Sequence, residues 1–212
     1  EIDNYYDDLR SIDGVSEEDG ERGFLDFIAD IEENSQKMTE EIIAMGSEMN
    51  EMNLSIDGAS NEIQRVKDKS GNVNASFVRN ICRKLSDPVD TFAGKLKNHV
   101  SEVTRYWGIV ENSYLSLLDN QYAQNQDNLE ELKKSINALG GMQNAIYDSD
   151  EKIEKFIDAL RGSMGMERRL NRAISMLVSE LEEYLLMTET IASSIDRIIS
   201  KGEVIIGVME EM

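Results

Sequence analysis

A heptad repeat of apolar residues is the feature that most constrains how this 212-residue chain can fold. From Phe24 to Val66, core-type positions recur in alternating steps of four and three residues, and Ser35 is the one polar member of the series. A strict seven-residue repeat keeps one face of a helix against a partner helix. The sequence therefore predicts one long helix here, packed along a seam. The middle of this seam consists of Ile42, Met45, Met49 and Met52.

Three further amphipathic segments follow, separated by short breaks. The second apolar series, residues 78–118, has a mean step near the helical 3.6, and the third and fourth series, residues 129–164 and 170–198, return to heptad spacing. Leu177 and Leu181 lie on the seam of the fourth. Breaks are expected at residues 69–72 and 161–165, where glycine and small polar residues gather. The expected fold is all-α, an elongated antiparallel helical bundle or coiled coil of about four long helices.

Several short stretches interrupt these patterns. Asp87 and Pro88 suit the cap and first position of a new helix, and a kink within one continuous helix is the alternative. Gly140-Gly141 weakens the third segment. Gly202 and Gly207 fall in a final apolar stretch, which we expect either to fray or to pack elsewhere. We therefore divide the chain into an acidic flexible lead or linker (1–22), a long-helix bundle (23–206) and a tail (207–212).

Charge excludes several classes of partner. The formal net charge is −20, and residues 1–41, with 15 acidic and 3 basic side chains, account for −12 of it. This balance argues against nucleic acid, whose phosphates require a basic face, and against anionic lipid. No apolar run approaches the roughly 20 residues that would span a bilayer. The single cysteine, Cys82, excludes an internal disulfide and fits a reducing compartment, so we expect a cytoplasmic protein.

The sequence offers no catalytic residue set, metal site or cofactor motif. One histidine, His99, and one cysteine cannot supply zinc or di-iron ligands, and neither a P-loop nor a GxGxxG turn occurs. Paired acids such as Glu40-Glu41 are typical of a solvated helix face. The expected protein is not an enzyme.

Two groups of residues are candidates for a small-ligand site. The first combines the lone tryptophan and lone histidine on one helix; its alternative is that the aromatic rings are core and the polar groups flank them. It consists of His99, Arg105, Tyr106 and Trp107.

The second group lies at helical spacing if the helix is continuous across a glycine-rich joint, and it could hold an anion. It consists of Arg161, Arg168 and Arg172, with Arg169 beside them. Salt bridges to the many carboxylates explain these arginines as well. Arg79 and Arg83, four residues apart, form a smaller basic pair to which the same two interpretations apply, an anion site or salt bridges.

Three functional classes fit these observations. The heptads favour a non-enzymatic interaction or oligomerisation module of a larger protein, linking a neighbouring domain to a protein partner or to a second copy of itself. The alternative is a sensory or signal-transmitting bundle that binds a small ligand. A pore-forming or membrane-remodelling protein is disfavoured, because such a protein needs a long apolar hairpin.

Overall fold

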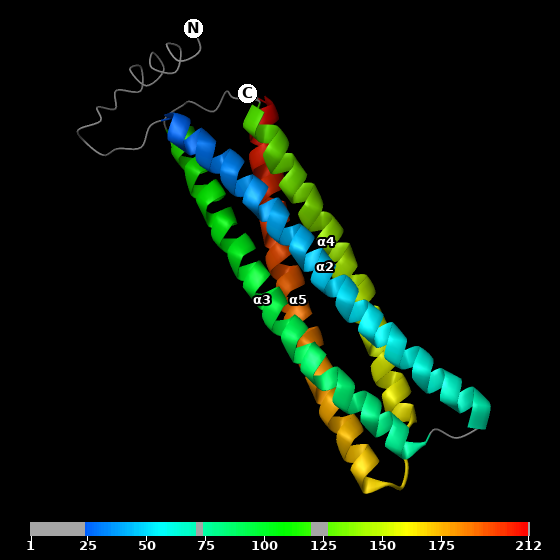
Figure 1. Cartoon of the computed structure of the whole chain (residues 1–212). Helices are drawn as coiled ribbons and strands as arrows, with labels where there is room; N and C mark the ends of the chain where they lie inside the picture. The colour runs from blue at the N-terminus through cyan, green and yellow to red at the C-terminus, as the bar shows by residue number, and fades with distance from the viewer. Residues whose placement is uncertain (1–23, 71–73, 120–126, 212) are drawn as a thin grey trace. The chain divides into compact units, whose positions relative to one another are not determined.

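The computed structural model describes residues 24–70, 74–119 and 127–211, whose regular secondary structure is entirely helical. Figure 1 shows the four helices: α2 (Phe24–Ser70), α3 (Ala75–Asp119), α4 (Asp127–Gly162) and α5 (Arg168–Glu211). These ranges contain no strand, so the prediction of an all-α bundle of four long helices is confirmed. The acidic lead of residues 1–22 lies outside the described residues. The expected tail of residues 207–212 is helical as far as Glu211.

Every helix runs through two compact units without ending. Unit 1 takes in Glu1–Glu41, Ser101–Leu139 and Arg197–Met212, and unit 2 takes in Ile42–Val100 and Gly140–Asp196. Each helix is 36 to 47 residues long and contributes one stretch to each unit. The units are therefore separate packing regions joined by four uninterrupted helices.

The two units share one arrangement of helices. Polar contacts between side chains connect the helices in the ring α2–α3–α5–α4, so α3 and α4, although consecutive in the chain, lie opposite each other. In unit 2 these contacts are Lys95–Glu48, Ser86–Glu180, Thr188–Asp150 and Ser149–Asn53. In unit 1 they are Ser113–Asp30, Lys201–Glu111, Lys133–Glu210 and Thr39–Ser135.

Contacts along unit 2 also give the helix directions. Ser149 of α4 bonds Asn53 of α2, and three residues later Lys152 bonds Asp57, so α2 and α4 run parallel. Contacts of α3 with α5 and the residue before it likewise advance together, from Arg79 with Glu167, just before α5, to Ser86 with Glu180 of α5. As a result, α3 and α5 begin at the same end of unit 2 (Figure 1).

The heptad seams form the interior of both units. Met52 and Leu181 are fully buried, Leu177 is 1% exposed, and Ile42 is 5% exposed beside Ile43 at 67%. Met45 and Met49 are buried in the same row. At about 25 cal/mol per Å² of apolar surface removed from water, this burial is the main favourable term in the fold. The seams are filled by the helices of one chain.

Helices end at the two expected breaks, α2 at Ser70 and α4 at Gly162, but the interruptions expected at Asp87-Pro88 and Gly140-Gly141 do not end helices. Helix α3 passes through Pro88, so the helix start expected at Asp87 does not form, and the alternative of one continuous helix is correct. Pro88 removes one backbone hydrogen bond, but Val89 and Phe92 are buried immediately after it and hold the helix in register. Helix α4 likewise continues through Gly140-Gly141.

Gly202 has a packing role in unit 1. A Cβ atom there would lie 2.2 Å from Cδ1 of Ile136 on α4 and 3.8 Å from Cη2 of Trp107 on α3. Glycine therefore allows α5 to approach its neighbours, and the stretch that was expected to fray or pack elsewhere lies within a helix that continues to Glu211.

Candidate functional site

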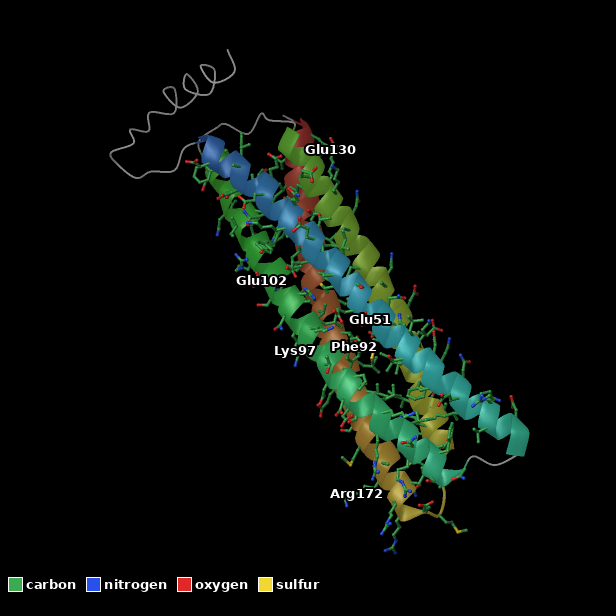
Figure 2. All side chains as sticks on the ribbon, in the orientation of Figure 1. Glu51, Phe92, Lys97, Glu102, Glu130 and Arg172 are labelled. Carbon is green, nitrogen blue, oxygen red and sulfur yellow. The ribbon has the colours of Figure 1, made fainter. Side chains whose placement is uncertain are left out.

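Two pairs of arginines line a groove in unit 2, near the end at which α3 and α5 begin. Arg79 and Arg83 lie one turn apart on α3, and Arg169 and Arg172 lie three residues apart on α5. Figure 2 shows Arg172 on this first part of α5. The groove has a volume of about 710 Å³, within the ~300–1,000 Å³ typical of small-ligand sites. The other lining residues are Cys82, Ser86, Asp87, Ala173, Met176 and Leu177.

We call this feature the arginine groove and define it by its four arginines. Its lining carries four guanidinium groups and one carboxylate, that of Asp87, in a chain whose net charge is −20. A second hollow of about 410 Å³ shares Arg79 and Arg83 and is otherwise lined by residues 74–80 at the start of α3. Positive charge is therefore concentrated at one place on an acidic protein.

Asparagine side chains position the two helix starts. The Oδ1 atom of Asn74 accepts a hydrogen bond from the backbone N–H of Ser76 at 2.9 Å, as an N-cap does. Asn171, in the first turns of α5, accepts a hydrogen bond from the N–H of Gly165 at 3.0 Å and donates one to the carbonyl of Gly165 at 2.7 Å. These bonds fix the starts of both helices, and with them the backbone that carries the arginines.

The helix starts themselves add to the positive potential. A helix N-terminus carries roughly half a positive charge, which favours acidic side chains and disfavours cations. Neither α3 nor α5 has an acidic residue in its first turn, and Arg169 occupies the second position of α5. Helix stability gives no reason for arginine at this position.

Ion pairing leaves most of the groove's charge uncompensated. Nη1 of Arg79 lies 3.5 Å from Oε1 of Glu167, and Nη2 of Arg79 lies 3.5 Å from Oγ of Ser76. Among the described residues, no carboxylate forms a salt bridge with Arg83, Arg169 or Arg172. The Arg79–Glu167 pair is long and solvent-accessible, a kind of pair that contributes little to stability.

Cys82 and Ser86 line the groove from α3. Cys82 is 3% exposed, and burial raises the pKa of its thiol to about 11, so the thiol stays protonated at neutral pH. The Ser86 hydroxyl donates a 2.6 Å hydrogen bond to the carboxylate of Glu180. The Cys82 thiol is therefore not an activated nucleophile, because the thiolate is the reactive form of cysteine.

The structure separates the arginines that the sequence grouped. Helix α4 ends at Gly162 and α5 begins at Arg168, so the continuous helix that would align Arg161 with the others does not exist. Arg161 pairs with Glu182 on α5. Arg168 is exposed at the start of α5 and does not line the groove. Arg172 does line it, together with Arg169 and with the α3 pair.

The four residues of the aromatic candidate occupy different environments. Trp107 is 5% exposed and lies in the core of unit 1. Tyr106 is half-buried, with the Arg105 guanidinium 4.2 Å and the Lys37 ammonium 5.8 Å from its ring centroid. Arg105 also binds Glu102 one turn earlier. His99 is half-buried in unit 2.

A titratable group occupies the interior seam of unit 2. Asp150 is half-buried, and Oγ1 of Thr188 lies 2.9 and 3.0 Å from its two carboxylate oxygens and 2.8 Å from the carbonyl of Leu185. Burial, followed by repulsion from Glu154 and Glu189, raises the pKa of Asp150 to about 6, although the Thr188 bond opposes this.

The number of protons available for hydrogen bonds explains why the protonated form of Asp150 fits this site. The Thr188 hydroxyl has one proton, so it can donate fully either to Asp150 or to the Leu185 carbonyl. A protonated Asp150 can donate to Oγ1 of Thr188, which leaves the threonine proton for Leu185. Burial and then the Asp150 charge also raise the pKa of Tyr184, whose hydroxyl has no hydrogen-bond partner among the described residues.

The described ranges contain no cluster of three or more His, Cys, Asp or Glu side chains that could hold a metal ion. No helix within them has the length and apolar content needed to cross a membrane. Comparison of the chain with protein-family models, with curated proteins and with solved structures found no match.

Proposed function

We propose that the chain is a non-enzymatic helical interaction module, part of a larger cytoplasmic protein, that joins a neighbouring domain to a protein partner or to a second copy. One observation carries the proposal. Helix α2 buries its heptad seam within the chain and still presents Ile43 and Leu54 on its outer surface, 67% and 63% exposed. Eleven residues are about three helical turns, so both side chains share one face.

The contrast within α2 is what makes this face a candidate interface. Exposed apolar residues are common when scattered, but these two are aligned on a helix whose inner face is already satisfied by Met45, Met49 and Met52. A partner helix laid along α2 would contact both. The protonated Cys82 thiol supports the non-enzymatic part of the proposal, because the groove's one cysteine is not in its nucleophilic form.

The test substitutes residues on the outer face of α2 and leaves the buried residues of its inner face unchanged. A double variant, Ile43→Asp with Leu54→Asp, should keep its melting temperature and no longer bind the partner. The control Glu51→Gln, on the same helix, should keep both its melting temperature and its partner. Light scattering identifies a second copy as partner if the mass is a multiple of 24.0 kDa and falls to one chain in the double variant. If the double variant keeps every association that the wild-type chain makes, α2 is not the interface.

A signal-transmitting bundle is the second candidate, and the arginine groove favours it. Helices α3 and α5 line the groove in unit 2 and continue without a break into unit 1, where α3 carries Trp107. A ligand in the groove that shifted either helix would reach the surroundings of this lone tryptophan. Trp107 emission should then change when tripolyphosphate is added, and Arg172→Gln should abolish the change. If calorimetry shows that tripolyphosphate binds and Trp107 emission stays unchanged, the groove is a binding site that transmits no signal to Trp107.

A further inference from the structure

We propose that the arginine groove binds a ligand that carries two or more phosphate groups. The inference stands apart from the interaction module proposed above, because it uses a different face and different helices of unit 2. Its basis is the convergence of Arg79, Arg83, Arg169 and Arg172 on one hollow of about 710 Å³.

The groove carries more cationic than anionic side chains: four arginines, against Asp87 in its lining, Glu167 beside Arg79 and Glu180 bonded to Ser86. Like charges that share a groove repel each other, and the two helix starts add further positive potential. The chain has 42 acidic side chains available, yet Arg83, Arg169 and Arg172 form no salt bridge among the described residues. A bound polyanion relieves the repulsion that the fold itself leaves in place.

Guanidinium geometry favours phosphate as the anionic group. The planar fork of arginine donates two parallel hydrogen bonds to a phosphate or a carboxylate, and a phosphate offers more oxygens and more charge. The arginines come as two pairs, one on each helix that lines the groove, which suits a ligand with an anionic group for each pair. The lining also contains the uncharged side chains of Cys82, Ala173 and Leu177, which can contact a compact spacer between the anionic groups.

The size of the groove and the charge of the chain exclude extended polyanions. A groove of about 710 Å³ accommodates a compact molecule, and a net charge of −20 repels a long nucleic acid outside the groove. Two sources of a compact polyphosphate remain, a free metabolite and the headgroup of a polyphosphorylated inositol lipid. Met166 is fully exposed and Met164 is 41% exposed in the joint just before α5, so a lipid surface could also meet apolar side chains here.

The experiment titrates the intact chain with defined probes. Tripolyphosphate and inositol hexakisphosphate are added in a calorimeter at fixed ionic strength, with sulfate as the single-anion control. Phosphatidylcholine vesicles with and without a few per cent of phosphatidylinositol bisphosphate are tested by cosedimentation.

The variants separate the groove from general charge effects. Arg83→Gln and Arg172→Gln each remove a groove donor. Arg65→Gln removes the same charge from an exposed site on α2 in the same unit. Glu167→Gln removes the carboxylate that pairs with Arg79. All four positions are exposed, so circular dichroism should show unchanged folding.

The expected result is saturable binding of at least one polyphosphate, with sulfate far weaker. Each groove variant should lower the affinity about tenfold, as expected for loss of one charge-assisted hydrogen-bonding group. Arg65→Gln should change the affinity less than about twofold, and Glu167→Gln should raise it a few-fold by freeing Arg79. Binding to the soluble probes identifies a free ligand, and binding only to the lipid-containing vesicles identifies a headgroup.

Three results would overturn the inference. One is an absence of binding to every phosphate probe. The other is binding that Arg65→Gln weakens as much as Arg172→Gln does, which would show attraction to charge in general. A salt-sensitive self-association that is lost in the groove variants and unaffected by polyphosphate would assign the arginines to an acidic surface of a second copy instead.

Discussion

Unit 1 and unit 2 are made from successive stretches of the same four helices in the same ring, but they treat polar groups differently. In unit 1 the buried Ser135 hydroxyl makes neutral contacts, since it donates to the Ser35 carbonyl at 2.5 Å and lies 3.0 Å from Oγ1 of Thr39. The buried Ser113 hydroxyl of unit 1 donates to the Asp30 carboxylate at 3.3 Å. In unit 2 a carboxyl group, that of Asp150, stands at a seam position. Neutral hydroxyls cross the interior at little electrostatic cost, whereas a carboxylate there loses hydration.

The outer surfaces of the units differ at the arginine groove. Cations bridge neighbouring helices in both units, as Lys201 does with Glu111 in unit 1 and Lys152 with Asp57 in unit 2. The arginine groove of unit 2 differs because its four arginines outnumber the carboxylates beside them, Asp87 in its lining and Glu167 paired with Arg79. The proposed ligand site and the pH-dependent group therefore both lie in unit 2.

The largest expected effect tests whether the units are energetically independent. Leu132 in unit 1 and Leu181 in unit 2 are both fully buried. Replacing either by Asp should lower the free energy of unfolding by about 4 kcal/mol or more, because an unpaired charge enters an apolar seam. Trp107 fluorescence follows unit 1, and far-UV circular dichroism follows all four helices.

The four continuous helices predict that either variant lowers both transitions together. The exposed neighbour change Glu183→Ala should leave both transitions within about 0.5 kcal/mol of the wild-type value. If Leu181→Asp melts the bulk of the helical signal while the Trp107 transition stays in place, the comparison becomes one between two independently stable regions.

A pair of glycine substitutions gives opposite signs in the two units. Gly202→Ala in unit 1 should destabilise the fold by about 1–2 kcal/mol, because the new methyl group would overlap Cδ1 of Ile136 and only partly regain helix propensity. Gly58→Ala in unit 2, with no atom within 4 Å of the added Cβ, should stabilise it by roughly 0.5–1 kcal/mol. Thermal unfolding of the two variants measures both. A stabilising Gly202→Ala would mean that Ile136 moves aside freely.

Heptad spacing was sufficient to predict the interior of the bundle. Ile42 and Ile43 are identical and adjacent, yet the repeat assigns the first to the seam, and the exposures are 5% and 67%. Helix interruptions were less predictable, because Pro88 signals a break by its local chemistry, while the buried residues on either side of it keep α3 continuous. Tertiary packing outweighed local propensity there.

The arginine groove could not be assembled from sequence spacing. Its two pairs, Arg79 with Arg83 and Arg169 with Arg172, lie some 90 residues apart, and no heptad specifies that α3 and α5 are parallel neighbours. Proximity in sequence instead grouped Arg161 with Arg172, although a helix end separates them. The missing information was the ring order of the helices.

An effect that appears only above about pH 4 concerns Asp150 in unit 2. Burial raises the folded-state pKa of Asp150 to about 6, above the roughly 3.9 of an unfolded chain. Below about pH 4 both states are protonated and the group imposes no penalty. Between pH 4 and pH 6 the unfolded chain loses its proton first, so the folded state loses stability as the pH rises. Above pH 6 both states are charged and the penalty is constant.

Asp150→Asn removes this titration and keeps an oxygen that can accept the Thr188 hydrogen bond. We expect the variant to be about 1 kcal/mol more stable than the wild type at pH 8, a figure reduced from the full linkage value because Asp150 is half-exposed to water. At pH 4 the two proteins should be equal. Urea unfolding at the two pH values measures the difference, and Asp148→Asn, at an exposed position two residues away, is the matched control. A gain of the same size at both pH values would show that the amide simply packs better, and that the carboxyl group of Asp150 is not what distinguishes unit 2 from unit 1.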